Sequence, residues 1–394
     1  MPMDNFNFQN PTRIVFGKGQ IKEITNYIPK DKIVIMTCGG GSIKKNGVYE
    51  QVMKALDGYT VKEFWGIEAN PDYETLLKCV ALVTEQGPKN CYMLSVGGGS
   101  VLDGTKFIAA ASLYTHSDNL WEILETYGAF VTEAIPIVDV MTLAATGSEM
   151  NWSSVVSWRN KHLKLFFQNE CVYPKVSILD PETMYSLPTR QTSNGIVDAM
   201  VHVLEQYITY PQGADVNDRY AEALLKTLID NGTKVMTNPE DYEARANVMW
   251  AATQALNGII AAGVATDWAT HMIGQEITAN IGMDHGQTLA CVEPVVFHYK
   301  FEQKKEKLAQ MAERVFNITE GTVEEKAEAG IQALINFYEN VVHVPTHISA
   351  YPYYNQDKAW IQDVKARFTK NGLVFGEHHD ITPEDVEKIL LSCY

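Results

Sequence analysis

The sequence predicts an α/β amino-terminal domain followed by an all-helical carboxyl-terminal domain. Before residue 150, short β-branched runs alternate with helix-like segments, the pattern of a doubly wound, mostly parallel sheet. After residue 188 the β-rich runs give way to helical periodicity with breaks. A chain of 394 residues is long enough for two such domains. We therefore predict domains at residues 1–188 and 189–394.

The elements of the first half follow one another as strand, helix, strand. Their strands are short runs rich in Val, Ile and aromatic residues, and their helices repeat apolar residues at helical spacing. The expected strands cover residues 32–37, 60–65, 91–96 and 135–142, and the expected helices cover residues 47–56, 72–86 and 101–111. Parallel strands joined by helices in this order predict a ligand site at the carboxyl ends of the strands.

Composition excludes several classes of protein. A formal net charge of −16 disfavours nucleic-acid binding, because phosphates would be repelled. The start "MPMDNFNFQNP" has neither a basic region nor an apolar run, and no apolar stretch approaches the roughly 18 residues of a membrane span. The six cysteines are scattered without CxxC spacing, as in proteins with reduced thiols. We expect a cytoplasmic protein that binds neither nucleic acid nor membrane.

Two glycine loops follow expected strands. Glycine allows close approach of a ligand to the backbone, and a helix start offers free amide hydrogens to an anion. A single GGGS sequence is more often a tight turn, but two on consecutive crossovers favour a pyrophosphate site, although GxGxxG and GxxxxGK[ST] are both absent. The loops place at the strand ends Gly39, Gly40, Gly41 and Ser42, and Gly97, Gly98, Gly99 and Ser100.

The first loop indicates which dinucleotide is preferred. A carboxylate at this strand end would bind the adenosine ribose hydroxyls and exclude a 2′-phosphate. The loop carries Ser42 in that region, with Lys44 and Lys45 close by, and these side chains favour a phosphate. We therefore expect NADP(H) to be preferred over NAD(H).

The stretch "GIVDAMVH" places Asp198 and His202 four residues apart in an apolar helical segment that begins soon after Pro188. Residues at i and i+4 share a helix face, so the two side chains can converge. A buried carboxylate must be hydrogen-bonded, paired or bound to a metal. The pair alone leaves an Asp–His ion pair and a metal site open.

Two further histidines favour the metal site. His271 lies in a second apolar helical pattern, and His285 follows Gly282 where one helix ends and the next begins. One carboxylate oxygen and three imidazole nitrogens suit a divalent transition metal. The remaining histidines are weaker candidates for metal ligands. His343 and His347 have the same i, i+4 spacing, but Pro345 lies between them and disfavours a continuous helix.

The order of these motifs resembles the iron-containing alcohol dehydrogenase family, specifically its butanol dehydrogenase and NADPH-dependent aldehyde reductase branch. The resemblance runs through almost the whole chain. It rests on "FNFQNPTRIVFGKG", "GGGSVLDGTK", "TLAATGSEMN", "DPETMYSLPTRQTSNGIVDAMVHVLEQY", "DWATH", "DHGQTLA" and "HDITPEDVEKIL". Motifs of this length are specific to the family.

The resemblance implies a dehydroquinate synthase-like architecture, with a dinucleotide-binding domain at 1–188, an all-helical metal-binding domain at 189–394 and the active site in the cleft between them. It implies metal ligation by Asp198, His202, His271 and His285. The implied cofactor contacts are Gly98, Gly99, Ser100, Asp103, Thr142, Thr146, Asn151 and Lys164, with Gly39, Gly40 and Ser42 near the adenosine ribose. Alternative interpretations remain for three of them: Asp103 as a helix first-turn residue, Thr146 as a cap and Lys164 as a solvated strand residue.

One position departs from the family pattern. Many relatives carry a histidine four residues after the third ligand, where this chain has Gln275. An amide can hydrogen-bond substrate or water, but it cannot shuttle a proton. The route of the proton to the product therefore stays open.

The implied reaction is hydride transfer between NADP(H) and small aliphatic aldehydes or primary alcohols, with the metal as Lewis acid. The resemblance implies ferrous iron first, with zinc as the alternative, and a homodimer. Two other hypotheses are a glycerol dehydrogenase or dehydroquinate synthase, whose ligand sets differ, and a binding protein that has lost turnover.

Overall fold

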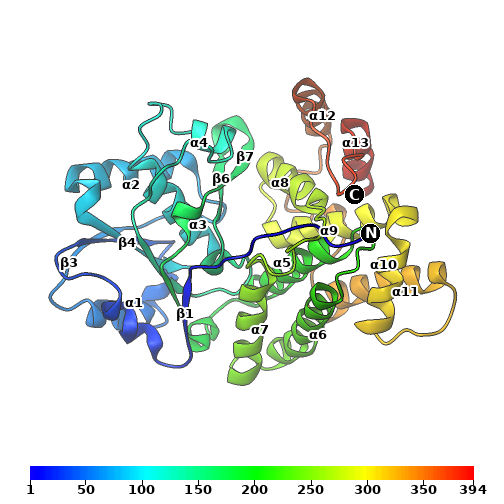
Figure 1. The fold of residues 1–394 in the computed structure, drawn as a ribbon, viewed down its shortest axis with the longest axis horizontal. Helices are drawn as coiled ribbons and strands as arrows, with labels where there is room; N and C mark the ends of the chain where they lie inside the picture. Colours follow the sequence, from blue (N-terminus) through cyan, green and yellow to red (C-terminus); the bar gives the residue numbers. More distant parts are fainter. The chain divides into compact units, whose positions relative to one another are not determined.

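The computed structural model describes residues 1–394 (Figure 1), and the chain divides into two compact units. The sheet unit consists of Gln9–Pro188 and Glu240–Thr253. The helical unit consists of Met1–Phe8, Thr189–Pro239 and Gln254–Tyr394.

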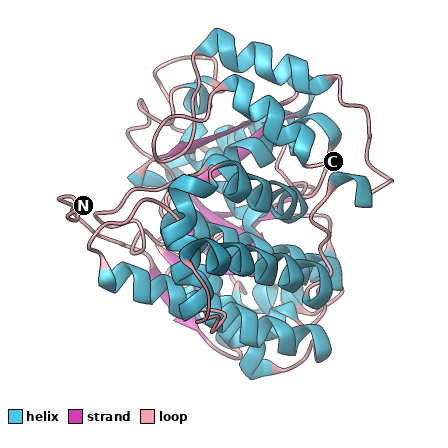
Figure 2. Cartoon of the chain, turned by 90° about the vertical axis from the view of Figure 1, so that its right-hand side faces the viewer, coloured by secondary structure: helices cyan, strands magenta, loops and turns pink.

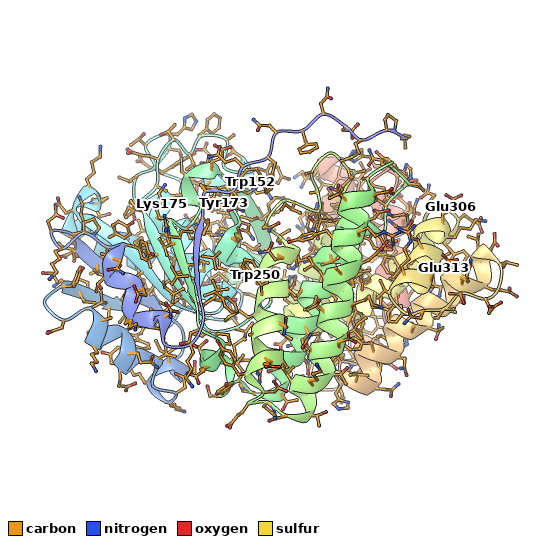
Figure 3. All side chains as sticks on the ribbon, turned by 60° about the horizontal axis from the view of Figure 1, so that its bottom comes forward. Trp152, Tyr173, Lys175, Trp250, Glu306 and Glu313 are labelled. Carbon is orange, nitrogen blue, oxygen red and sulfur yellow. The ribbon has the colours of Figure 1, made fainter.

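The units share the boundary after Pro188 with the division expected from sequence, but two segments are exchanged. Residues 240–253 belong to the sheet unit, where the Thr253 hydroxyl donates to the buried Glu149 carboxylate and the Trp250 ring packs edge-on against Phe16. Figure 3 labels Trp250. Residues 1–8 belong to the helical unit, because the amide of Asp4 donates to the carbonyl of Gly263. Sequence position alone does not reveal either exchange.

The sheet unit is built on six parallel strands in the order β1-β8-β5-β4-β2-β3. The parallel sheet expected from sequence is thus confirmed, and all four expected strands are present. The strands are β1 (Arg13–Phe16), β2 (Ile33–Cys38), β3 (Thr60–Phe64), β4 (Cys91–Gly97), β5 (Ile137–Met141) and β8 (Val176–Leu179). Strands β4 and β5 are buried along their whole length, as central strands of a doubly covered sheet are.

Helices cover both faces of this sheet. The helices of the unit are α1 (Val48–Ala55), α2 (Tyr73–Gln86), α3 (Gly99–Ala111), α4 (Glu122–Glu125) and α7 (Tyr242–Ala255) as far as Thr253. One face packs against α1 and the 3-10 helix Gln20–Asn26 in a single apolar cluster. On the opposite face α3 lies on β4, and its Thr105 hydroxyl is 2.6 Å from that of Thr37 on β2.

A short antiparallel hairpin adds two strands that the sequence did not predict. Strand β6 (Ser153–Trp158) pairs with β7 (Leu163–Gln168). The turn between them places His162 at φ 50°, although hairpin turns with positive φ usually use glycine or asparagine. The hairpin packs against α3 through β6.

The helical unit contains helices and no strand, apart from an isolated bridge between Phe375 and Ile381. Figure 2 shows its helices in cyan. The helices are α5 (Thr189–Tyr207), α6 (Asp215–Thr237), α8 (Ala269–Ile281), α9 (His285–Tyr299), α10 (Phe301–Arg314), α11 (Val323–Asn336), α12 (Trp360–Asn371) and α13 (Pro383–Ser392). The all-helical character expected from sequence is confirmed.

The core of the helical unit joins α8, α9, α12 and α13 through fully buried residues such as Ile273, Val292, Phe368 and Ile389. Elsewhere α10 packs along α11, where Glu313, labelled in Figure 3, pairs with Lys326. None of the helices combines the length and apolar character that crossing a bilayer requires.

Candidate metal centre and dinucleotide loops

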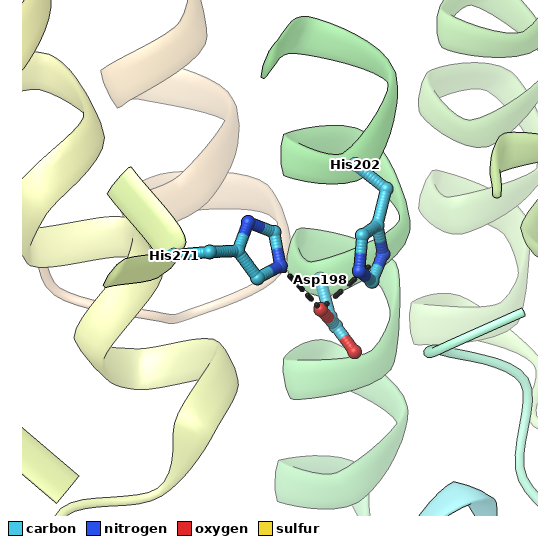
Figure 4. Close-up of side chains that lie close together, drawn as sticks. All are labelled: Asp198, His202 and His271. Carbon is cyan, nitrogen blue, oxygen red and sulfur yellow. Dashed lines mark ion pairs between the residues drawn. The ribbon is translucent and has the colours of Figure 1, made fainter. Parts of the chain in front are cut away.

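Helix α5 carries the first two predicted ligands. It begins directly after Pro188 and is apolar and buried on nearly all sides from Ile196 onward, as expected of a helix inside a helical unit. Asp198 and His202 lie one turn apart, so the Asp198 Oδ1 atom stands 3.4 Å from His202 Nδ1 (Figure 4). Both side chains are less than one-tenth exposed.

Helix α8 brings His271 to the same carboxylate oxygen. Its Nε2 atom lies 3.7 Å from Asp198 Oδ1 (Figure 4), and its ring stacks on that of His202 at a centroid distance of 4.5 Å. Trp268, which precedes the helix, has φ 64° and places its ring 5.5 Å from His271. A tryptophan in the left-handed region is unusual and marks a constrained backbone beside the site.

His285, the first residue of α9, is the fourth predicted ligand, and it stands apart from the close group of Asp198, His202 and His271. Its Nε2 atom lies 3.6 Å from Asp198 Oδ1. Close packing of α9 on α5 makes this approach possible, because a Cβ atom on Gly286 would stand 2.5 Å from the carbonyl oxygen of Asn194. Asp284 fixes the same junction by accepting both guanidinium hydrogen bonds of Arg190.

The donor atoms fit a divalent cation. Asp198 Oδ1, His202 Nδ1 and His271 Nε2 are buried without a hydrogen-bond partner, and the ligand atoms of these three residues lie within 4.8 Å of one another. Ligands of a tetrahedral ion with bonds of about 2.1 Å stand about 3.4 Å apart, close to the 3.4 to 3.7 Å between Asp198 Oδ1 and the imidazole nitrogens. Buried polar atoms left without partners are costly, and a bound cation removes that cost.

The electrostatics also favour a cation. Burial lowers the pKa of His202 to about 4, so its imidazole is neutral near pH 7. Burial alone would raise the pKa of Asp198, but the surrounding histidines hold it below its usual value. A neutral imidazole and an ionised carboxylate are the forms that bind metal. Burial opposes the charge on His271, yet Glu205 and Asp198 raise its pKa to about 9, so a metal must displace a proton from this ring.

Glu205 is a residue of the site that sequence reasoning missed. It lies on α5 three residues after His202 and is only 1 % exposed. Its carboxylate accepts from His271 Nδ1. The sequence feature that could have predicted Glu205 is a further carboxylate in the same apolar helix, seven residues after Asp198.

Gln275 lies one turn after His271 on α8 and is buried, and its Oε1 atom has no hydrogen-bond partner. The side chain can therefore form a hydrogen bond to a ligand. As an amide it holds no proton that it could transfer to an alkoxide.

The predicted dinucleotide loops lie in the sheet unit, at the carboxyl ends of adjacent strands. Gly39 follows β2, Gly98 follows β4, and Thr142 follows β5 with its amide donating to the Gly97 carbonyl. The chain runs from β2 outward to β3 and then from β4 outward to β5 and β8 on the other side. Strands β2 and β4 therefore flank the topological switch point, where doubly wound sheets bind dinucleotides.

The second loop is closely packed at the start of α3. Gly98 precedes this helix, and a Cβ atom on Gly99 would stand 2.2 Å from the hydroxyl of Thr146. The same hydroxyl accepts from the amide of Ser148. Only glycine fits here, at the start of a helix, where free backbone amides can bind an anion.

Two predicted residues are connected through Asn70, which sequence reasoning missed. Lys164 on β7 donates to the Asn70 side chain at 2.9 Å, and the Asn70 amide donates to the Ser100 hydroxyl at 3.2 Å.

In the first loop Gly40 and Ser42 are exposed. The Lys44 ammonium lies 3.9 Å from the centroid of the Trp65 ring.

Asp103 and Asn151 are bound to other residues of the sheet unit. The Asp103 carboxylate accepts from the Ser148 hydroxyl at 2.6 Å and from the Val155 amide at 3.0 Å. The Asn151 side chain accepts from Lys106 and donates to the Gly147 carbonyl. These contacts give both residues a role in holding the loop after β5, and their contact with a cofactor stays a prediction.

Comparison with known proteins agrees with these features. Residues 11–181 match the sequence profile described as iron-containing alcohol dehydrogenase, and residues 192–394 match the carboxyl-terminal profile of that family. The NADPH-dependent aldehyde reductase YqhD of Escherichia coli is 52 % identical over 96 % of this chain and 97 % of its own. A crystal structure of YqhD aligns with a TM-score of 0.96 over all of both chains, at 50 % identity. The NADH-dependent butanol dehydrogenase A of Thermotoga maritima aligns with a TM-score of 0.92 at 34 % identity, over 100 % of this chain and 99 % of its own. The chain belongs to the iron-containing alcohol dehydrogenase family.

Proposed function

We propose that this protein is a metal-dependent aldehyde reductase and alcohol dehydrogenase that transfers hydride between NADP(H) and small aliphatic aldehydes or primary alcohols. The observation that carries the proposal is the convergence of three imidazole nitrogens on one oxygen of Asp198, at 3.4 to 3.7 Å. In the sheet unit, two glycine loops at neighbouring strand ends supply the matching cofactor site.

The residues divide the chemistry as follows. A divalent cation held by Asp198, His202, His271 and His285 supplies Lewis-acid polarisation of the carbonyl oxygen, and NADPH supplies the hydride. Reduction consumes one aldehyde, one NADPH and one proton, and it yields one alcohol and NADP⁺. Gln275 can orient substrate or water through its unpartnered Oε1 atom, but the proton comes from another donor.

The preference for NADP(H) rests on the first loop and on one relative. The loop after β2 ends in an exposed Ser42 followed by the exposed Lys45, without a carboxylate among its glycines. The E. coli relative is named as NADPH-dependent, whereas related butanol dehydrogenases of Clostridium acetobutylicum are named as NADH-dependent. We therefore assign NADP(H) as the preferred cofactor.

Ferrous iron is our first assignment for the metal, in keeping with the family description. Three imidazoles and one carboxylate also suit zinc. Metal analysis of the protein purified without oxygen distinguishes the two ions. We further propose a homodimer, which sedimentation of the purified protein tests.

Activity with defined metals tests the proposal. The protein is stripped with a chelator, reloaded with Fe²⁺ or Zn²⁺, and mixed with NADPH and butyraldehyde while the absorbance of the reduced nicotinamide is followed. We expect sustained oxidation of NADPH that chelator abolishes. His271→Ala should lower kcat/KM by at least about 100-fold because the carbonyl loses its electrostatic support.

His298→Ala is the matched control. His298 lies on α9 but is exposed and pairs with Glu328, so its removal should leave activity intact. Oxidation of NADH alone would contradict the cofactor assignment. No oxidation with either nicotinamide after loading with both metals would contradict the proposed enzyme and favour a binding protein that has lost turnover.

A further inference from the structure

The Glu205 carboxylate is the acceptor for three N–H groups of one short segment. The Thr270 amide donates to Oε1 at 2.6 Å, and the His271 amide donates to Oε2 at 3.2 Å. The Nδ1 atom of the His271 ring also meets Oε2. The Glu205 side chain is almost fully buried, with 1 % of its surface exposed.

The ring contact decides which nitrogen of His271 carries the hydrogen. A carboxylate can only accept, so the hydrogen of the neutral ring resides on Nδ1. The lone pair is then on Nε2, the atom that lies 3.7 Å from Asp198 Oδ1 and has no hydrogen-bond partner. The opposite tautomer would point a hydrogen at the cation and leave two acceptors facing each other.

The backbone contacts decide where His271 stands. Helix α8 begins at Ala269, so the amides of Thr270 and His271 belong to its first turn and have no partner within the helix. A negative group at this end also faces the positive end of the helix dipole. The backbone of α5 adds a further contact, since the Glu205 carbonyl accepts from the Asp267 amide at 2.8 Å. The helix that carries Asp198 and His202 thus also fixes the third ligand.

We propose that Glu205 is a positioning residue of the metal centre: without being a ligand itself, it holds His271 as the Nδ1-protonated tautomer, aims Nε2 at the cation and thereby sets the affinity for the metal. Partners of this kind orient metal-binding histidines in general, and their removal typically weakens metal binding by about 10–100-fold. The inference rests on the metal site proposed above.

Glu205→Gln tests the inference most directly. The amide keeps the volume of the side chain but loses the charge, and one of its two ends is an NH₂ group that cannot accept from His271. We expect the dissociation constant for Zn²⁺, measured by competition with a chromophoric chelator, to rise by about 10–100-fold. At saturating metal, most of the lost kcat/KM should return, because the variant retains all four ligands.

Glu293→Gln is the matched control. Glu293 is likewise fully buried and lies on α9 in the same unit, but its hydrogen bond is to the Tyr338 hydroxyl and not to a ligand. This variant should bind Zn²⁺ as the parent does. Equal weakening in both variants would overturn the inference, since the loss would then follow from replacing any buried carboxyl group by an amide. A Glu205→Gln affinity within threefold of the parent would overturn it as well.

A second measurement needs no substitution at Glu205. In the zinc-loaded parent labelled with ¹⁵N-histidine, the signal of His271, assigned with His271→Gln, should show a proton on Nδ1 and none on Nε2. A proton on Nε2 would overturn the inference even if Glu205→Gln failed to fold. If the parent binds no metal at all, the proposed function fails, and this outcome is distinct from equal binding by parent and variant.

Discussion

Lys106 is a buried ammonium group in the middle of α3, and it holds the segment after β5 in place. Its Nζ atom donates to the carbonyls of Ser148, Asn151 and Ser153 and to the Asn151 side chain, at 2.7 to 3.0 Å. Burial lowers the pKa of Lys106 to about 8, while Asp103 and Glu149 nearby favour the charged form. The three N–H groups of Lys106 thus serve four acceptor oxygens, so one hydrogen is shared between two of them.

Lys106→Met should destabilise the sheet unit and weaken the cofactor site. The substitution leaves the carbonyls of Asn151 and Ser153 without this donor and the Ser148 carbonyl with only the Asn151 amide at 3.4 Å. Each buried group that stays unsatisfied costs about 1–3 kcal/mol. We expect the free energy of unfolding, measured by urea titration, to be lower by about 3 kcal/mol or more. We also expect weaker binding of NADPH, measured by the fluorescence of the nucleotide. Lys22→Met, at an exposed lysine of the same unit, is the control. Equal stability of the two variants would contradict this role of Lys106.

The sequence allowed the ligand residues to be proposed but not the residues that hold them. Asp198 and His202 stood out because polar groups at helical spacing are costly in an apolar helix. Glu205 and Lys106 obey the same logic, yet their contacts come from other segments, α8 for Glu205 and residues 148–153 for Lys106. The role of Asn70 could not be predicted from the sequence, because its position beside Ser100 depends on the backbone of Asn70 itself, which has φ 55°.

At the scale of elements, the approach of α9 to α5 determines whether His285 reaches Asp198. Gly286, the second residue of α9, lies against the backbone of Asn194 on α5. A Cβ atom there would stand 2.5 Å from the Asn194 carbonyl oxygen and 2.8 Å from its Cα. A rigid backbone cannot move aside as a side chain can, so a larger residue must push the helices apart.

Gly286→Ala should therefore weaken metal binding. Overpacking of this kind costs about 1–3 kcal/mol, and the displacement acts directly on His285, so we expect the dissociation constant for Zn²⁺ to rise by at least about 10-fold. Gly232→Ala is the control, because its Cβ atom would also face α5 but at ordinary distances of 3.4 Å from Ile196. Chelator competition measures both. Unchanged affinity in Gly286→Ala would show that the helices tolerate the methyl group.

The elements themselves were predictable to different degrees. The long apolar strands β2, β4 and β5 were all expected, as were helices α5 and α8. The structure adds β1 and β8, each four residues long, too short for alternation to be evident. It also adds the β6–β7 hairpin, whose turn lacks the usual glycine signal.

At the scale of the whole molecule, buried carboxyl groups link stability to pH. The chain carries a formal net charge of −16, yet several acids lie inside the units without full compensation. Glu293 is fully buried, its Oε2 atom accepts from Tyr338, and its Oε1 atom has no hydrogen-bond partner. Burial raises the pKa of Glu293 to about 8.

The sign of the pH effect follows from proton binding. Between the ordinary glutamate pKa of about 4.3 and about 8, the folded protein binds a proton at Glu293 that the unfolded chain has released. Stability from this group is therefore fully present below about pH 4.3 and is lost progressively as pH rises to about 8. The two pKa values differ by about 4 units, and each unit corresponds to about 1.4 kcal/mol, so the loss amounts to about 5 kcal/mol.

Glu293→Gln should remove this dependence, because its amide is neutral at every pH and can still accept from Tyr338. The stability of the variant relative to the parent, measured by urea unfolding at pH 5, 6.5 and 8, should therefore rise with pH. The contributions of other titratable groups to the pH dependence of stability cancel in this difference. Glu320→Gln, at an exposed carboxyl of the same unit, should show a flat difference over the same range. A flat difference for Glu293→Gln as well would mean that Glu293 stays ionised in the folded protein and has a compensating partner.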